Sequence, residues 1–314
     1  MSQLLPPYPF ILDKLNSSKV IPFLGAGASL GGRVQGAKWK KGDNNFLPLG
    51  SELASHLADT TQFPSEETLD LTKVAQYYNV VGGRQALNEE LHGIFNCDYP
   101  LTPLHTFLAS VPAPLLMVTT NYDDLIERAL DEMNRQLGDQ ARPYDVVIHT
   151  TDVNSGDLLL WWPYGAAEPT KVTPNKLDVD LTERTVIYKM HGAVDRKQAE
   201  RDSYVITEDD YIDFLARMTK NKAVPAIFAE FFQRRHFLFL GYGLNDWNLR
   251  VVLNRIEKDL RRPKGITSWA IQYRTRMLER RFWQERGVEV YDLPLDDFVQ
   301  ALKQRREQQK ESRP

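Results

Sequence analysis

The sequence has a single cysteine among its 314 residues. One thiol cannot form an internal disulfide, and it cannot build a zinc site that needs several cysteines. Cys97 lies in the polar stretch Phe95-Asn-Cys-Asp-Tyr-Pro100, where no neighbouring side chain is of a type that would activate a thiolate. We therefore interpret Cys97 as a bystander thiol rather than a nucleophile.

Long apolar runs and a strong charge of one sign are also missing. No apolar run approaches the roughly 20 residues of a membrane-spanning helix, and the N-terminus lacks the basic and apolar regions of a secretory signal. We expect a cytoplasmic protein with no membrane partner. The net charge of −3 argues against a dedicated nucleic-acid-binding protein, so no direct nucleic-acid binding is expected.

What the sequence does contain is a regular alternation of short apolar segments with helical patterns. Strands are expected at residues 19–24, 115–118, 146–149, 158–162, 186–190, 204–207, 236–240, 268–272 and 288–291. This alternation predicts an α/β fold with a Rossmann-like, mostly parallel sheet that is flanked by helices. In this organisation residues 1–300 form the main domain, and residues 301–314 form a charged C-terminal tail. A final helix is expected from Leu295 onward, and the charged run from Lys303 to Pro314 frays or is disordered.

Helical patterns at about 50–110 predict a small helical subdomain inserted into the sheet domain, with Ser51 capping its first helix. A later helix is predicted to begin with a capping box, in which Thr207 and Asp210 cap one another. The segment 30–46 is rich in Gly, Lys and Asn. It is either a disordered insertion or a mobile lid over a ligand, and the sequence favours neither.

Four of the expected strands end in chemically unusual turns. These are Gly25-Ala-Gly-Ala-Ser29, Thr120-Asn-Tyr-Asp123, His191-Gly192 and Gly241-Tyr-Gly-Leu-Asn-Asp246. The carboxyl ends of parallel strands share one edge of a sheet, where ligands bind, so the four turns are expected to converge.

The glycine turn after the first strand would let backbone N–H groups approach a pyrophosphate. It lacks the third glycine of the dinucleotide fingerprint, because Leu30 stands there, and an ordinary glycine turn explains it equally well. Asn121 has the alternative role of a turn or cap residue, and His191 that of a buried packing histidine. The remaining histidines show no metal-ligand spacing and are interpreted as surface or packing residues: His56, His92, His105, His149 and His236.

The order and spacing of the four turns resemble the sirtuin family, and most closely its bacterial NAD hydrolases of anti-phage defence. Two further stretches support the resemblance, Leu47-Pro-Leu-Gly-Ser-Glu-Leu53 and Tyr204-Val-Ile-Thr-Glu-Asp-Asp-Tyr211, and it covers roughly residues 18 to 300. Sirtuin deacylases carry a four-cysteine zinc module, and their last motif usually reads Gly-Thr-Ser where this chain has Gly241-Tyr-Gly243. Both departures favour the branch that has no zinc module and needs no metal.

The resemblance implies roles for individual residues. The pyrophosphate of NAD would be held by Gly25, Ala26, Gly27 and Ser29, and its adenosine side by Gly241, Gly243 and Asp246. Asn121 would position a water molecule or a ribose hydroxyl, and Asp123 would support that loop or contact nicotinamide. His191 would act as the general base. These types suit the chemistry, because nicotinamide is a good leaving group and the difficulty lies in the oxocarbenium-like transition state and its water.

The implied activity is hydrolysis of NAD, as substrate, to nicotinamide and ADP-ribose or a cyclised product. The implied biology is a toxic defence effector controlled by homo-oligomerisation or by a separately encoded sensor, such as a DNA-translocating ATPase or an Argonaute-type protein. Two alternatives stay open. One is a zinc-free deacylase or ADP-ribosyltransferase, and the other is a non-catalytic sensor of NAD or ADP-ribose.

Overall fold

A computed structural model describes residues 5–34, 36–151, 158–219, 224–242 and 266–311. Its main feature is a sheet with the strand order β11-β10-β9-β1-β2-β6-β3-β4-β5. The strands are β1 (Val20–Leu24), β2 (Leu116–Thr119), β3 (Tyr144–His149), β4 (Leu159–Trp162), β5 (Thr170–Val172), β6 (Thr185–Lys189), β9 (His236–Leu240), β10 (Ser268–Gln272) and β11 (Val288–Asp292).

All neighbouring strands from β11 to β3 are parallel, and β4 and β5 continue the sheet in the antiparallel sense. The predicted α/β fold with a mostly parallel sheet is therefore confirmed. Strand β5 is an addition, since the sequence predicts no strand at residues 170–172. Every residue of β1 and of β9 is buried, which explains why both read as continuous apolar runs.

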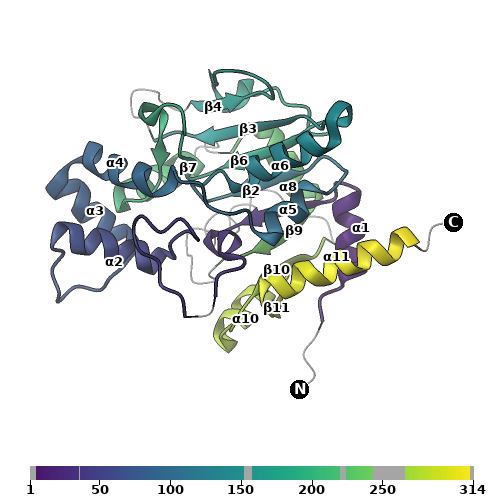
Figure 1. Cartoon of the computed structure of the whole chain (residues 1–314), viewed down its shortest axis with the longest axis horizontal. Helices are drawn as coiled ribbons and strands as arrows, with labels where there is room; N and C mark the ends of the chain where they lie inside the picture. The colour runs from purple at the N-terminus through teal and green to yellow at the C-terminus, as the bar shows by residue number, and fades with distance from the viewer. Residues whose placement is uncertain (1–4, 35, 152–157, 220–223, 243–265, 312–314) are drawn as a thin grey trace.

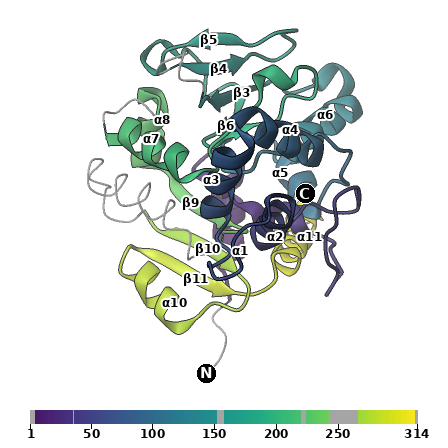
Figure 2. The same ribbon diagram turned by 90° about the vertical axis from the view of Figure 1, so that its left-hand side faces the viewer.

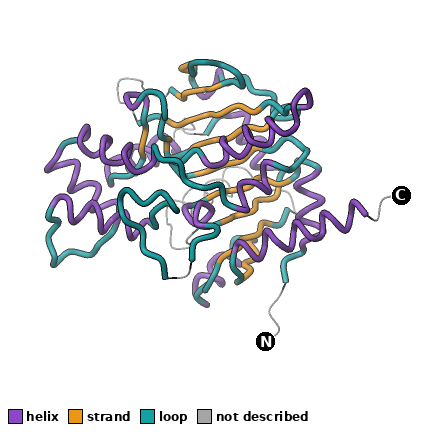
Figure 3. Tube along the Cα trace, in the orientation of Figure 1, coloured by secondary structure: helices purple, strands orange, loops and turns teal. Residues whose placement is uncertain are grey.

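Helices cover both faces of the sheet and create two separate cores (Figures 2 and 3). On one face pack α1 (Tyr8–Asn16), α5 (Pro103–Ala109), α6 (Leu125–Leu137) and α11 (Leu295–Glu311), with residues such as Leu12, Phe107 and Phe298 in the core. On the other face pack α7 (Glu208–Thr219), α8 (Ala226–Arg234) and α10 (Met277–Gln284), which contribute Phe214, Phe232 and Trp283. Among the described residues, no helix is both long and apolar enough to cross a bilayer.

A third core belongs to the helical subdomain, which lies to one side of the sheet (Figure 1). Helices α2 (Gly50–Thr61), α3 (Leu71–Gly82) and α4 (Arg84–Phe95) form it together with the segment before them. Helix α5 packs against α6 and α11 instead, so it belongs to the sheet layer rather than to the subdomain. The division of the chain at residue 300 stays a prediction.

Two local predictions at helix ends have opposite outcomes. Ser51 does not cap α2, because the helix already begins at Gly50, and the Glu52 carboxylate accepts the N–H of Leu49 at 2.9 Å. The capping box before α7 is confirmed. The Asp210 N–H donates to Thr207 Oγ1 at 3.1 Å, and Asp210 Oδ2 accepts the N–H of Thr207 at 2.9 Å.

The prediction of a frayed tail is wrong as far as Glu311, because α11 continues to that residue. Its charged side chains are used in packing. The guanidinium of Arg305 lies over the ring of Tyr8, and that of Arg306 lies over Phe107 and donates to Ser110 Oγ at 2.6 Å. Arginine stems can cover apolar surface while the guanidinium stays solvated, so a charged sequence need not be a loose one.

Candidate functional site

A cavity of about 690 Å³ opens at the carboxyl ends of the parallel strands. Its walls contain members of all four predicted turns, so the structure brings those distant segments together. The predicted site residues that line it are Gly25, Ala26, Gly27, Ser29, Asn121, Asp123, His191 and Gly241. Gly243 and Asp246 lie outside the described residues. The sheet places β2, β6 and β3 on one side of β1 and β9, β10 and β11 on the other, so the cavity sits where the strand order reverses.

The glycine turns after β1 and β9 pack against each other. The Gly25 N–H donates to Leu240 O at 3.0 Å, and the Gly27 N–H donates to Gly241 O at 2.8 Å. A Cβ on Gly27 would lie 2.8 Å from the Gly241 Cα, and Gly241 itself has φ of +71°. The packing of the two turns therefore explains these glycines, and the N–H groups of Gly25 and Gly27 are not available to a pyrophosphate as the sequence suggested.

The side chain of Asn121 is held by the turn that follows β1. Its Nδ2 donates to Gly25 O at 3.0 Å and to Ser29 Oγ at 3.1 Å. The Ser29 hydroxyl in turn donates to Asp123 Oδ2 at 2.9 Å, and Asp123 Oδ1 accepts the N–H of Leu125 at the start of α6. This network orients the amide, so that its oxygen is the group it can offer to a ligand in the cavity.

His191 is 4% exposed and sits deep in the cavity wall. Its ring meets the rings of Tyr211 and Phe214 edge-on, with centroids 5.4 and 5.3 Å away. Burial lowers the pKa of His191 to about 4, because the charged imidazolium loses its hydration. The ring is therefore neutral at physiological pH, which is the form that accepts a proton.

Acid should destabilise the fold through two buried histidines. Burial also lowers the pKa of His105, which contacts Thr102 Oγ1, to about 4. The unfolded chain binds protons more tightly than the native one below about pH 6.5, so stability is complete above that pH and falls towards pH 4. Each histidine contributes up to about 3 kcal/mol to this loss of unfolding free energy. Urea unfolding between pH 7.5 and 4.5 measures this loss, and the loss should be smaller in His191→Gln. If the wild type and His191→Gln lost the same unfolding free energy, the lowered pKa of His191 would be contradicted.

The structure adds cavity residues that the sequence analysis did not single out. Gln272 ends β10, and Asp296 lies in the first turn of α11, directly after β11. Gln272 Oε1 and Asp296 Oδ1 are both buried, and neither has a hydrogen-bond partner in the described parts of the chain. The rule that identified the other turns, that ligands bind at the carboxyl ends of parallel strands, would have found these residues too.

Arg33 was also missed, although it comes from the glycine-rich segment 30–46. Its guanidinium lines the cavity and pairs with the Glu52 carboxylate, and this hydrogen bond lowers the pKa of Glu52 to about 2. Trp39 from the same segment is buried in the third core, and its backbone N–H donates to Glu52 Oε1 at 2.9 Å. The alternative of a disordered insertion is therefore wrong for the described part of the segment, and its action as a lid stays a prediction.

Within the described residues no group of three or more histidine, cysteine, aspartate or glutamate side chains is arranged to hold a metal ion. The cavity thus contains two groups that can take part in a reaction, the neutral imidazole of His191 and the oriented amide of Asn121. Gln272 and Asp296 line it as well.

Comparison with known proteins places the chain in a family. A family model described as a SIR2-like domain matches residues 115–291. The chain is 31% identical over 249 residues to NAD(+) hydrolase ThsA of Acinetobacter baumannii, covering 78% of this chain and 41% of that protein. It is 24% identical over 250 residues to Defense-associated sirtuin 2 of Bacillus subtilis, covering 79% of this chain and 20% of that protein. The chain thus spans less than half the length of these relatives. The domain match, over more than half of the chain, shows that it belongs to the SIR2-like family.

Proposed function

We propose that this protein hydrolyses NAD at the bond between nicotinamide and ribose. The observation that carries the proposal is that Asn121 and His191 line one cavity together with the glycine turn after β1. Relatives named NAD(+) hydrolase ThsA, 31% identical to this chain, support the choice of substrate.

The site residues have complementary tasks in this reaction. His191 is neutral, because burial lowers its pKa to about 4, and it accepts a proton from the attacking water or a ribose hydroxyl. Because the Nδ2 of Asn121 is engaged by Gly25 and Ser29, its carbonyl oxygen is the atom that accepts a hydrogen bond from that hydroxyl. Orientation of this kind lowers the barrier without covalent chemistry by the protein. Nicotinamide leaves as a neutral molecule, and water completes ADP-ribose; attack by an internal nucleophile would give a cyclised product instead.

We propose further that the enzyme acts in bacterial defence, where loss of NAD arrests an infected cell. The name of the Bacillus subtilis relative, Defense-associated sirtuin 2, supports this role. An enzyme that destroys NAD must be silent in healthy cells, so we propose control by homo-oligomerisation or by a separately encoded partner, with a DNA-translocating ATPase or an Argonaute-type protein as candidates.

The purified protein incubated with NAD, alone and with candidate partners, tests the activity. Chromatography should detect nicotinamide and ADP-ribose in equal amounts. A product mixture in which a cyclised nucleotide replaces ADP-ribose would correct the second product. Nicotinamide release that requires an acylated peptide would overturn the proposal in favour of a deacylase. NAD binding with no release under any of these conditions would favour a sensor.

A further inference from the structure

A buried lysine lies directly beneath the Asn121 loop. Lys189 is the last residue of β6, two positions before His191, and its side chain is 1% exposed. Its ammonium group donates to the backbone carbonyl of Asp123 and pairs with Glu127 Oε1 at 2.7 Å, in the first turn of α6. No other residue of β1, β2, β6 or β9 is a lysine or an arginine.

Stability alone does not explain this lysine. Burying an ion pair removes both charges from water, and the attraction between them scarcely offsets this desolvation free energy. A protein with an apolar pair of similar size at the same place is often as stable. The second oxygen of Glu127 is also buried and has no hydrogen-bond partner in the described residues, so the pair is not fully satisfied. What the ammonium does fix is the direction of the Asp123 carbonyl, and hence the path of the backbone between β2 and α6.

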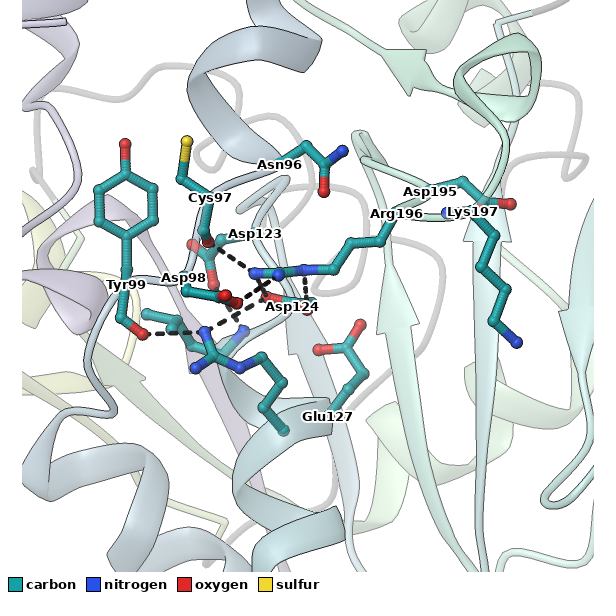
Figure 4. Close-up of polar contacts among 12 residues, drawn as sticks. Asn96, Cys97, Asp98, Tyr99, Asp123, Asp124, Glu127, Asp195, Arg196 and Lys197 are labelled. Carbon is teal, nitrogen blue, oxygen red and sulfur yellow. Dashed lines mark hydrogen bonds and ion pairs between the residues drawn. The ribbon is translucent and has the colours of Figure 1, made fainter. Parts of the chain in front are cut away.

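A second cation approaches the same loop from outside (Figure 4). The guanidinium of Arg196 pairs with the carboxylate of Asp124, the residue directly before α6. It also donates to Asp98 Oδ1 and to Cys97 O, each at 2.6 Å, in the connection that follows α4. Arg196 therefore ties the start of α6 to the end of the helical subdomain.

We propose that Lys189 and Arg196 are positioning residues, which hold the Asn121–Asp124 loop in its active geometry through their contacts with the Asp123 carbonyl and the Asp124 carboxylate. The proposal rests on the proposed NAD hydrolase activity for its kinetic consequence. Neither side chain lines the cavity, so their effect on the reaction is exerted through the loop.

The path from these cations to the reactive groups is short and continuous. The Asp123 carbonyl is fixed by Lys189, and the carboxylate of the same residue accepts the Ser29 hydroxyl at 2.9 Å. Ser29 Oγ in turn accepts the Asn121 amide at 3.1 Å. A loop freed from Lys189 would rotate the Asp123 peptide and loosen this chain of bonds. Small displacements of an orienting group cost large factors in rate, while binding of the substrate is far less sensitive.

Lys189→Met and Arg196→Met test the proposal, with Arg135→Met as the matched control. Arg135 also carries a paired charge on α6, but it is exposed at the far end of the helix. We expect kcat for nicotinamide release to fall by about 10- to 100-fold in Lys189→Met, with little change in KM, and by a smaller factor in Arg196→Met. The control should keep both constants. A merely structural role would instead lower the amount of folded enzyme and leave kcat per folded molecule unchanged.

Hydrogen exchange gives a second measurement that does not depend on activity. The N–H groups of Thr120, Asn121 and Leu125 are hydrogen-bonded to Leu24 O, Thr119 Oγ1 and Asp123 Oδ1. Their exchange should accelerate about tenfold in Lys189→Met, while the second half of α6 keeps its protection. Unchanged exchange in this loop would overturn the proposal. Faster exchange in Lys189→Met, together with no nicotinamide release by the wild-type protein in any assay, would reject the NAD hydrolase and leave the positioning role standing.

Lys189→Met removes one partner of a buried pair and can impair folding by itself. The double variant Lys189→Met/Glu127→Leu replaces the pair by two apolar side chains, so no unpaired charge is left to impair folding. If the double variant is as stable as the wild type and still shows the loss of kcat and the faster exchange, positioning is supported. If it is stable and both quantities are normal, the proposal is wrong.

Discussion

Nicotinamide release is expected to fall by about 100- to 10,000-fold in His191→Ala, which is the contribution of a well-placed general base. The neutral imidazole lies in the cavity wall, and no other histidine lines the cavity among the described residues. Asn121→Ala should cause a loss of about 100-fold, since it removes the amide that orients the attacking hydroxyl and also releases Ser29. Initial rates with saturating NAD, followed by chromatography, measure both losses.

His56→Ala serves as the control for these variants. His56 is half-buried on α2, where its Nε2 contacts Glu90 Oε1 at 2.6 Å, and it does not line the cavity. Its replacement should leave the rate per folded molecule within about twofold of the wild type, because His56 touches neither the cavity nor the residues that hold Asn121 and His191. Nicotinamide release that persists at wild-type rates in both His191→Ala and Asn121→Ala would place the chemistry elsewhere.

Gly241→Ala is expected to cost about 3–5 kcal/mol of folding free energy or to prevent folding. A Cβ at this position would lie 2.1 Å from the backbone nitrogen of Ala28, and the glycine has φ of +71°. Neither the backbone of the turn after β1 nor that of the turn after β9 can retreat, because the N–H of Gly27 donates to Gly241 O across the junction. The measurement is urea unfolding followed by circular dichroism.

Gly287→Ala separates the clash from the strain of the backbone. Gly287 has φ of +68°, nearly the same as Gly241, but nothing lies within 4 Å of the position of its Cβ. This variant should lose only about 1–2 kcal/mol, the cost of the left-handed conformation itself. Equal losses in the two variants would mean that the contact between the turns contributes nothing to stability.

The parallel sheet and the location of the site were predictable because both follow from short-range patterns. A strand buried on both faces must be apolar throughout, and β1 and β9 are. The convergence of Gly25, Asn121, His191 and Gly241 follows from the rule that parallel strands end at one edge, once those strands are recognised. The roles of these residues in catalysis stay predictions until the variants are measured.

Other features depend on contacts that the sequence does not encode locally. Lys189 ends an otherwise apolar strand and would be assigned to the surface, since lysine is almost never fully buried without a partner. Its partner Glu127 lies on α6, far away in the sequence. The continuation of α11 from Lys303 to Glu311 was missed for a related reason: a charged segment reads as disordered unless one knows that Tyr8 and Phe107 lie beneath its arginines.

The position of β1 at the centre of the sheet has a consequence for the order of folding. Phe23 pairs with Val118 of β2 on one side and with Phe239 of β9 on the other. Strand β1 can therefore complete its pairing only after β2 and β9, which are synthesised long after it. Contacts between residues so far apart in the sequence form slowly, because a long loop must close first. A nascent chain that ends before β9 lacks Gly241 and therefore lacks one wall of the cavity. A ribosome making this protein thus carries no complete cavity until β9 and the turn that follows it have been translated.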